Sequence, residues 1–221
     1  YGAKKLGMHI HTRYEVSNNA GQDICDIVNN EGFDFLLVGS GISMSDSPDD
    51  IAATRYRTSF YNRYFKRFKA PESWFYPGAL LKDKTKMFIA RSNCDVGVFI
   101  NRNFVKATNT LVVISSEEDL FLLDYTRTLL KATHGSVGIV AKMSTTTPGH
   151  DQILKELWDF VSSIPQTQLL PDKDLTPGLF NSYNFMLIGY NTWNDVSEHR
   201  KEALQKMPST LILNKNRNEQ K

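Results

Sequence analysis

The sequence predicts an α/β fold made of two tandem units with parallel sheets, the first of which is incomplete at its N-terminal end. The main observation is an internal repeat, in which residues 33–39 (FDFLLVG) match residues 183–189 (YNFMLIG). Each segment is followed by a second match, 97–103 (GVFINRN) and then 210–216 (TLILNKN). A short apolar run that ends in glycine is typical of a buried parallel strand. Two matches in the same order indicate a duplicated unit.

Strand and helix patterns alternate through the second unit, which we expect over residues 106–221. Strands are predicted at 110–114, 137–141, 184–189 and 210–214, with a shorter one at 166–170. Helices are predicted after Ser115–Asp119, whose residues suit an N-cap and a capping box, after Pro148, and from about 195 to 206. This order predicts a doubly wound parallel sheet.

The first unit, expected over residues 1–105, carries only the last part of that pattern. A strand is predicted at 6–11, a helix at 22–31, and strands at 33–38 and 96–100. We expect sequence upstream of Tyr1 to supply the missing strand–helix–strand part. From Gly39 to Asn101 is 62 positions, whereas from Gly189 to Asn214 is 25, so residues 43–79 are interpreted as an insertion.

Composition limits the classes of function. The 221 residues are 41% hydrophobic and 23% charged, which is typical of a globular protein. A net charge of +2 does not indicate a nucleic-acid-binding protein. No apolar run approaches the roughly 18 residues of a membrane-spanning helix. The two cysteines stand 69 positions apart, and Asn-x-Ser/Thr does not occur, which favours a reducing compartment.

Two five-stranded units in this order resemble the universal stress protein fold, which is Rossmann-like. The sequence further resembles the degenerate form of that fold in the cytosolic tails of monovalent cation/proton antiporters, in particular fungal K+/H+ antiporters. This resemblance rests on residues 93–102 (NCDVGVFINR), a Cys-x-Val-Gly strand with a polar-basic turn, ahead of the strand at 110–114. Residues 78–81 ahead of 87–90 also resemble the helix that leads into that strand. The insertion is not part of the family pattern.

The resemblance also suggests where a nucleotide would bind. Stress proteins that bind nucleotides hold the phosphates on a Gly-x-x-Gly turn after the fourth strand and on Gly-Ser or Gly-Thr at the next helix start, where glycine permits a close approach. The first unit has residues 39–42 (GSGI) and 82–85 (KDKT) at these places, and the second has residues 189–192 (GYNT). The broken glycine pattern favours ordinary strand-exit turns. The remaining candidates for anion contact are Gly39, Ser40, Gly41, Lys82, Lys84 and Thr85.

Basic and aromatic residues are interleaved in the insertion. Residues 51–69 hold six cations and no acid, namely Arg55, Arg57, Arg63, Lys66, Arg67 and Lys69. After a helix start at Ser47–Asp50, the aromatic residues Phe60, Tyr64 and Phe68 would form one helical stripe. The stripe is explained either by packing on its own domain or by contact with an anionic membrane surface or a partner.

No catalytic constellation is present in the sequence. His9 and His11 share a strand face, but no third metal ligand accompanies them. Cys94 begins a buried strand and is expected to be an inert core thiol. We therefore expect no enzyme activity, no metal and no cofactor.

The resemblance implies a non-catalytic regulatory domain of a multi-pass antiporter, on the cytosolic face of an endomembrane, that modulates potassium transport and ion and pH homeostasis. The implied partners are the protein's own transmembrane transport domain, a second copy of the chain and an anionic membrane surface, but no nucleic acid. Two alternatives stay open: a nucleotide-binding universal stress protein, and a peripheral membrane or protein-interaction module. The sequence leaves open the transported ion, the effector, the oligomeric state and the organelle.

Overall fold

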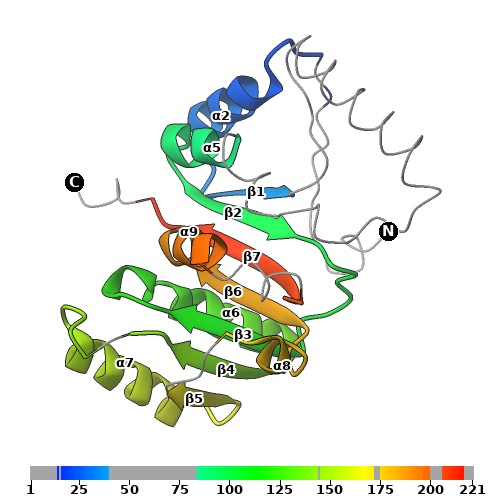
Figure 1. The fold of residues 1–221 in the computed structure, drawn as a ribbon. Helices are drawn as coiled ribbons and strands as arrows, with labels where there is room; N and C mark the ends of the chain where they lie inside the picture. The colour runs from blue at the N-terminus through cyan, green and yellow to red at the C-terminus, as the bar shows by residue number, and fades with distance from the viewer. Residues whose placement is uncertain are drawn as a thin grey trace.

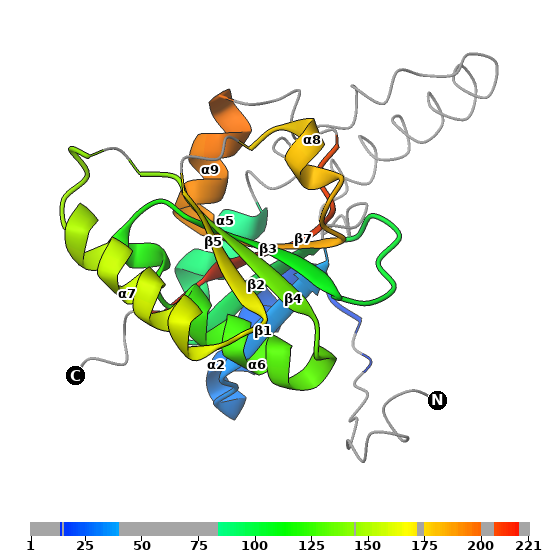
Figure 2. The same cartoon turned by 90° about the horizontal axis from the view of Figure 1, so that it is seen from below.

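A single mixed sheet organises the chain. The computed structural model describes residues 14, 16–39, 84–143, 145–171, 175–199 and 206–216. Within them lies a seven-stranded sheet with the order β1-β2-β7-β6-β3-β4-β5 and helices on both faces (Figures 1 and 2). Neighbouring strands are parallel except β2 and β7, which are antiparallel. The predicted α/β class with a largely parallel sheet is confirmed.

The strands are β1 (Phe35–Gly39), β2 (Asp95–Ile100), β3 (Asn109–Ile114), β4 (Ser136–Ala141), β5 (Thr167–Pro171), β6 (Phe185–Gly189) and β7 (Ser209–Asn214). The helices are α2 (Ala20–Glu31), α5 (Lys84–Arg91), α6 (Leu122–Thr133), α7 (His150–Ser163), α8 (Pro177–Phe180) and α9 (Tyr190–His199), with a 3-10 turn η3 at Glu117–Asp119. Each of these strands was predicted to within two residues. The strand predicted at 6–11 and the insertion helix lie outside the described residues.

Local chemistry explains where several helices begin and end. The side chain of Asn19 caps α2, and Gly32 ends it in the left-handed conformation with φ of 67°. Thr176 caps α8, which has Pro177 in its first turn. Helix α9 begins at residue 190, five residues before the predicted start, so that prediction was wrong. Its first turns bury Thr192 and Trp193. The residues around these two are polar and have the composition of a loop, so the sequence did not indicate that the helix begins here.

The matched strands of the repeat take equivalent places in the sheet. β1 pairs with β2, β6 pairs with β7, and the two pairs join where Val98 of β2 lies opposite Ile212 of β7. The second match is out of register by one residue: Leu37 lies opposite Gly97, whereas its counterpart Leu187 lies opposite Leu211. The division of the chain into units at 1–105 and 106–221 stays a prediction.

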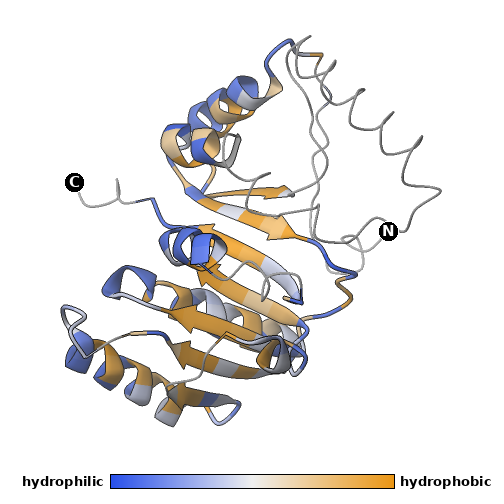
Figure 3. Ribbon diagram, in the orientation of Figure 1, coloured by the Kyte–Doolittle hydropathy of each residue, from blue (hydrophilic) through white to orange (hydrophobic). Residues whose placement is uncertain are grey.

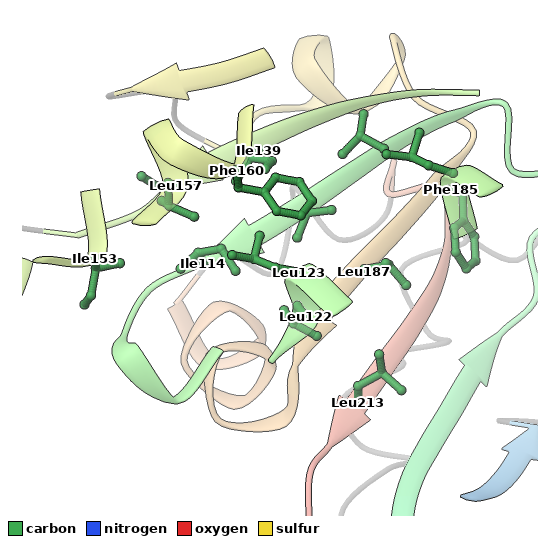
Figure 4. Packing of buried hydrophobic residues seen from close by; sticks show 14 of the residues in the cluster. Ile114, Leu122, Leu123, Ile139, Ile153, Leu157, Phe160, Phe185, Leu187 and Leu213 are labelled. Atoms are coloured by element: carbon green, nitrogen blue, oxygen red, sulfur yellow. The ribbon is translucent and has the colours of Figure 1, made fainter. Parts of the chain in front are cut away.

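The main core lies on both faces of the strands β3, β4, β6 and β7. Under α6 and α7, Leu122 and Leu157 pack with strand residues such as Ile114 (Figure 4). On the opposite face, Trp193 of α9 packs over Ile188 of β6. A smaller cluster joins α2 and α5 to the first two strands and consists of Cys25, Phe88 and Val96.

Candidate functional site

The strand order locates the place where a doubly wound sheet normally binds its ligand. Such ligands lie outside the carboxyl ends of the strands, where the strand order reverses. From β3 the chain adds β4 and β5 on one side and then β6 and β7 on the other, so the reversal lies between β3 and β6. We call this place the crevice, and it is bordered by Ser115, η3, Gly189 and the first turn of α9.

A buried carboxylate occupies the crevice. The side chain of Asp119 turns inward and the residue is 2% exposed. Its Oδ2 accepts hydrogen bonds from the backbone N–H of Ser115 at 2.8 Å, from the Ser115 hydroxyl at 3.1 Å and from the Thr192 hydroxyl at 2.6 Å. The two hydroxyl groups also contact each other. Asp119 therefore ties the end of β3 to α9, which is 73 positions away in sequence.

The glycine that ends β6 makes room for this carboxylate. A Cβ atom at Gly189 would collide with Oδ1 of Asp119. In phosphate-binding loops, glycine has the same use, because it lets an anion approach the backbone closely. Here the anion that approaches is a side chain of the chain itself.

Helix α9 closes the rest of the crevice. It starts at Tyr190, directly after β6, so no loop is left between strand and helix to surround a phosphate. Asn191 donates a hydrogen bond to Glu118 at 2.7 Å, and Lys142 forms an ion pair with Asp195 at 2.9 Å. The remaining cavity has a volume of about 50 Å³, whereas ligand pockets typically have about 300–1,000 Å³.

The charge of the crevice also disfavours a phosphate. The described residues that line the remaining cavity include Glu118 and Asp119, and Lys215 is the one cation among these described residues. Repulsion between a phosphate and a buried carboxylate is strong, because little water screens it there.

Most of the predicted site residues lie outside the part of the chain that the structure describes. Gly39 ends β1 opposite Phe99, and Lys84 and Thr85 begin α5. The residues outside are Ser40, Gly41, Lys82, His9, His11, Arg55, Arg57, Arg63, Lys66, Arg67, Lys69, Phe60, Tyr64 and Phe68. The predicted anion contacts and the predicted membrane or partner contacts of the insertion therefore stay predictions.

Sequence reasoning missed Asp119, because residues 115–119 were interpreted as a capping box. That interpretation was wrong: Ser116 makes no side-chain cap hydrogen bond, and α6 begins only at Leu122, after the turn η3. The spacing of serine and acid suits a capping box and an inward-facing carboxylate equally well. The contact between Asp119 and Thr192 joins residues 73 positions apart, and no local sequence pattern shows it.

Two buried thiols lie in and beside the smaller cluster. Cys25 and Cys94 are free, with 0% and 6% of their surfaces exposed. Burial is the main cause that raises the pKa of both thiols, so each is held in the unreactive neutral form. Among the described residues, no group of three or more His, Cys, Asp or Glu side chains is placed to hold a metal ion.

The segment that carries the antiporter resemblance lies where the two strand pairs meet. Asp95, at the start of β2, accepts hydrogen bonds from the backbone N–H of Asn216 and from the hydroxyl of Tyr125, both at 2.7 Å. At the other end of β2, the backbone N–H of Arg102 donates to the Ser209 hydroxyl at 2.8 Å. We call these contacts the seam, because they join β2 to α6 and to both ends of β7.

A second cavity of about 190 Å³ lies beside the seam. The described residues that line it include Asp34 and Asp95, and none of these residues is a lysine or arginine. This cavity is also below the usual size of a ligand pocket, and its charge does not suit a phosphate.

The comparisons with known proteins support the fold and nothing finer. No family model matches the sequence, and no curated protein matches it. The structure is similar to that of a universal stress protein from Archaeoglobus fulgidus DSM 4304, with a TM-score of 0.50 and 12% sequence identity. The match covers 90% of this chain and 66% of the archaeal chain. The chain thus has a universal-stress-protein-like, Rossmann-like fold, as the sequence predicted.

Proposed function

We propose that this chain is a non-catalytic regulatory domain of a membrane potassium/proton antiporter, placed on the cytosolic face of an endomembrane. The observation that carries the proposal is the closed crevice, in which the Asp119 carboxylate and α9 fill the place of a nucleotide. A stress-protein fold with a closed crevice is suited to protein contacts rather than to nucleotide chemistry. Residues 93–102, which resemble antiporter tails, form β2 and its seam contacts, and this supports the proposal.

Regulation in this proposal is a coupling between the domain and the transport domain. The transport domain moves the ions, and no residue of this chain carries them. The domain changes transport only if it binds the conformations of the transport domain unequally. Further proposed partners are a second copy of the chain and, through residues 51–69, an anionic membrane surface. Among the described residues, no helix combines the length and apolar character needed to span a membrane.

The first experiment asks whether the chain is part of a membrane protein. An antibody against residues 106–221 is used on membranes from the cells that make the protein, before and after washing with alkaline carbonate. We expect a band far above the 25.2 kDa of the chain that resists the wash. A band near 25 kDa in the soluble fraction contradicts the proposal.

The second experiment tests regulation itself. Cation/proton exchange is measured in sealed vesicles that contain the whole polypeptide, or a version without residues 1–221. We expect both versions to exchange ions, with a different dependence of the rate on pH or cation concentration. Identical dependences contradict a regulatory role. Binding of residues 51–69 to a membrane is tested with anionic lipid vesicles, where deletion of these residues is expected to abolish salt-sensitive binding.

The fold similarity is also consistent with a second function, that of a nucleotide-binding stress protein. Gly39 and the start of α5 are the parts of its predicted site that the structure describes. Thermal unfolding with ATP or AMP separates the two functions, because a ligand of the folded state raises the melting temperature. Our proposal predicts no saturable rise. A rise that is lost in the Lys82→Ala/Lys84→Ala variant would establish the rival.

A further inference from the structure

The loop between β2 and β3, residues 101–108, has an exposed apolar tip between two cations. Val105 is 93% exposed and Phe104 is 39% exposed. Arg102 precedes this pair and Lys106 follows it, and residues 96–116 contain no aspartate or glutamate. Figure 3 shows the apolar tip between two hydrophilic stretches, just beyond the end of β2. Neither the crevice nor the two cavities include these apolar side chains.

Contacts within the loop hold the tip in place. The backbone N–H of Phe104 donates a hydrogen bond to Oδ1 of Asn101 at 2.9 Å, and Asn103 takes the left-handed conformation with φ of 58°. The ring of Phe104 packs against the rings of Phe99 and Phe185, with centroids 5.5 and 5.2 Å apart. These contacts fix Phe104 and leave the next side chain exposed. A group that is held in its exposed position loses little conformational entropy when it binds.

The loop lies at the end of the sheet where β1 and β2 end and where β3, β4, β5, β6 and β7 begin (Figure 1). We call this end of the sheet the basic end. The described segments that connect elements here are 101–108, 134–135, 164–166, 181–184 and 206–208. These described segments contain three cations and no aspartate or glutamate; the cations are Arg102, Lys106 and Lys206.

The opposite end of the sheet has a different charge. The described segments that connect elements there, with η3 included, contain four acidic residues and two lysines: Asp34, Glu117, Glu118, Asp119, Lys142 and Lys215. An anionic surface is therefore attracted to the basic end and not to the opposite end.

We propose that the basic end is a membrane-binding surface, where Val105 and the exposed part of Phe104 enter the interface of an anionic bilayer. Arg102 and Lys106 then lie among the lipid phosphates. Such a contact combines the removal of apolar surface from water with attraction between cations and anionic headgroups. The inference rests on the part of the proposed function that places the chain at a membrane, but neither on an antiporter nor on residues 51–69.

The topology of the sheet supports this orientation. β1 pairs with β2 in parallel, and its last residue, Gly39, lies opposite Phe99. The chain therefore leaves β1 at the basic end, twelve positions before the segment 51–69, which has six cations and no acid. Two membrane contacts that start from the same end of one domain strengthen each other, because the first raises the effective concentration of the second.

An acidic protein surface fits the basic end less well than a bilayer does. A specific protein interface usually buries about 800 Å² on each partner around an apolar core. The apolar tip of this loop consists only of Val105 and part of Phe104. A contact of this size suits the lipid interface, where neighbouring cations add to the binding.

An environment-sensitive dye at position 105 tests the proposal. The chain of 221 residues with Val105→Cys is labelled with NBD and mixed with vesicles of phosphatidylcholine that contain about 30% phosphatidylserine. Cys25 and Cys94 are buried, so the dye reacts with the introduced thiol. The control is Asp151→Cys, whose side chain is fully exposed at the start of α7, at the opposite end of the sheet.

We expect anionic vesicles to shift the emission of the dye at position 105 to the blue and to leave the emission at position 151 unchanged. Vesicle binding with no shift at position 105 overturns the proposal and leaves residues 51–69 as the membrane contact. Absence of vesicle binding also overturns it. A shift with membranes from the producing cells, but not with protein-free vesicles, indicates a protein partner and rejects the proposal. The antibody experiment tests the antiporter separately from all these outcomes.

The unlabelled chain gives a second measurement, in which binding is determined by sedimentation of the same vesicles. We expect Lys106→Gln to weaken binding about fivefold at low salt, because one cation near an anionic surface contributes about that much. Lys155→Gln, the matched control at an exposed position of α7, is expected to stay within about twofold of the unchanged chain. Equal affinities of the two variants contradict a contact at the basic end.

Discussion

Replacement of Asp119 by alanine is the most direct test of the closed crevice. The substitution removes an acceptor that three donors share: the backbone N–H of Ser115 and the hydroxyls of Ser115 and Thr192. The two hydroxyls already contact each other, so they keep a partner. The Ser115 N–H loses the acceptor that Asp119 provides.

The expected loss of stability follows from the hydrogen-bond donors that lose their acceptor. A buried polar group that loses its partner costs about 1–3 kcal/mol, and hydrogen bonds to a charged acceptor lie at the upper end. We therefore expect Asp119→Ala to lower the free energy of unfolding by about 2–4 kcal/mol. For a chain of this size that corresponds to a drop of about 5–15 °C in melting temperature. Asp119→Asn keeps one acceptor oxygen, and its loss is expected to be smaller.

Urea unfolding is the appropriate assay, because a buried tryptophan lies next to the site. Trp193 follows Thr192 in α9 and is 1% exposed. The chain has three tryptophans, so in a background with Trp74→Phe and Trp158→Phe the fluorescence reports on this region, while circular dichroism reports on the whole fold. Asp124→Ala is the control, since its ion pair with Arg127 at 3.2 Å lies on the surface and is worth less than about 0.5 kcal/mol. If Asp119→Ala is as stable as the control, the carboxylate does not hold the crevice closed.

Three further predictions concern a glycine, two equivalent leucines and a buried thiol. Gly189→Ala should cost about 1–3 kcal/mol of unfolding free energy through overpacking against Asp119, and clearly less in the Asp119→Ala background, as a double-mutant cycle in urea would measure. Leu187→Ala should cost about 2–5 kcal/mol, whereas Leu37→Ala in residues 1–221 should cost less than about 1 kcal/mol because the side chain is 58% exposed; equal losses in urea unfolding would contradict the difference in coverage. Burial raises the pKa of the Cys25 thiol above 9.0, so the folded state keeps a proton that the unfolded chain releases, and stability should fall as the pH rises above about 9. Urea midpoints from pH 7 to 10 should show a weaker fall in Cys25→Ala, and identical slopes would rule the thiol out as the cause.

The strands were predictable because buried parallel strands are continuous apolar runs. Residues 111–114 and 185–188 contain no polar side chain, and all of them are buried. Their composition alone therefore indicates strands that are buried on both faces. The start of α9 was harder to predict. Thr192 is buried there because its hydroxyl binds Asp119, and a sequence pattern counts such a residue as polar.

The joining of the two strand pairs and the crevice depend on contacts that no local pattern contains. The repeat indicates that β2 and β7 are equivalent, but it does not indicate that they pair with each other in the antiparallel direction. Asp119 and Thr192 belong to different halves of the doubly wound order and meet only when β6 is placed beside β3. The sequence match of residues 97–103 with 210–216 is wrong by one residue, and an error of one residue assigns every side chain of the strand to the opposite face of the sheet. Only the observed pairing of Leu187 with Leu211 gives the correct alignment.

The crevice and the edge of β1 together bear on how such a domain would receive a signal. At the crevice, the donors and the glycine that a phosphate would use are already engaged by the Asp119 side chain, so a nucleotide would have to displace a buried charge. At β1, in contrast, Phe35 contacts Tyr125 of α6, with ring centroids 5.9 Å apart, but Leu37 is 58% exposed. For the proposed regulatory function, we therefore expect an effector to contact exposed surface, such as that around Leu37, rather than to enter the crevice.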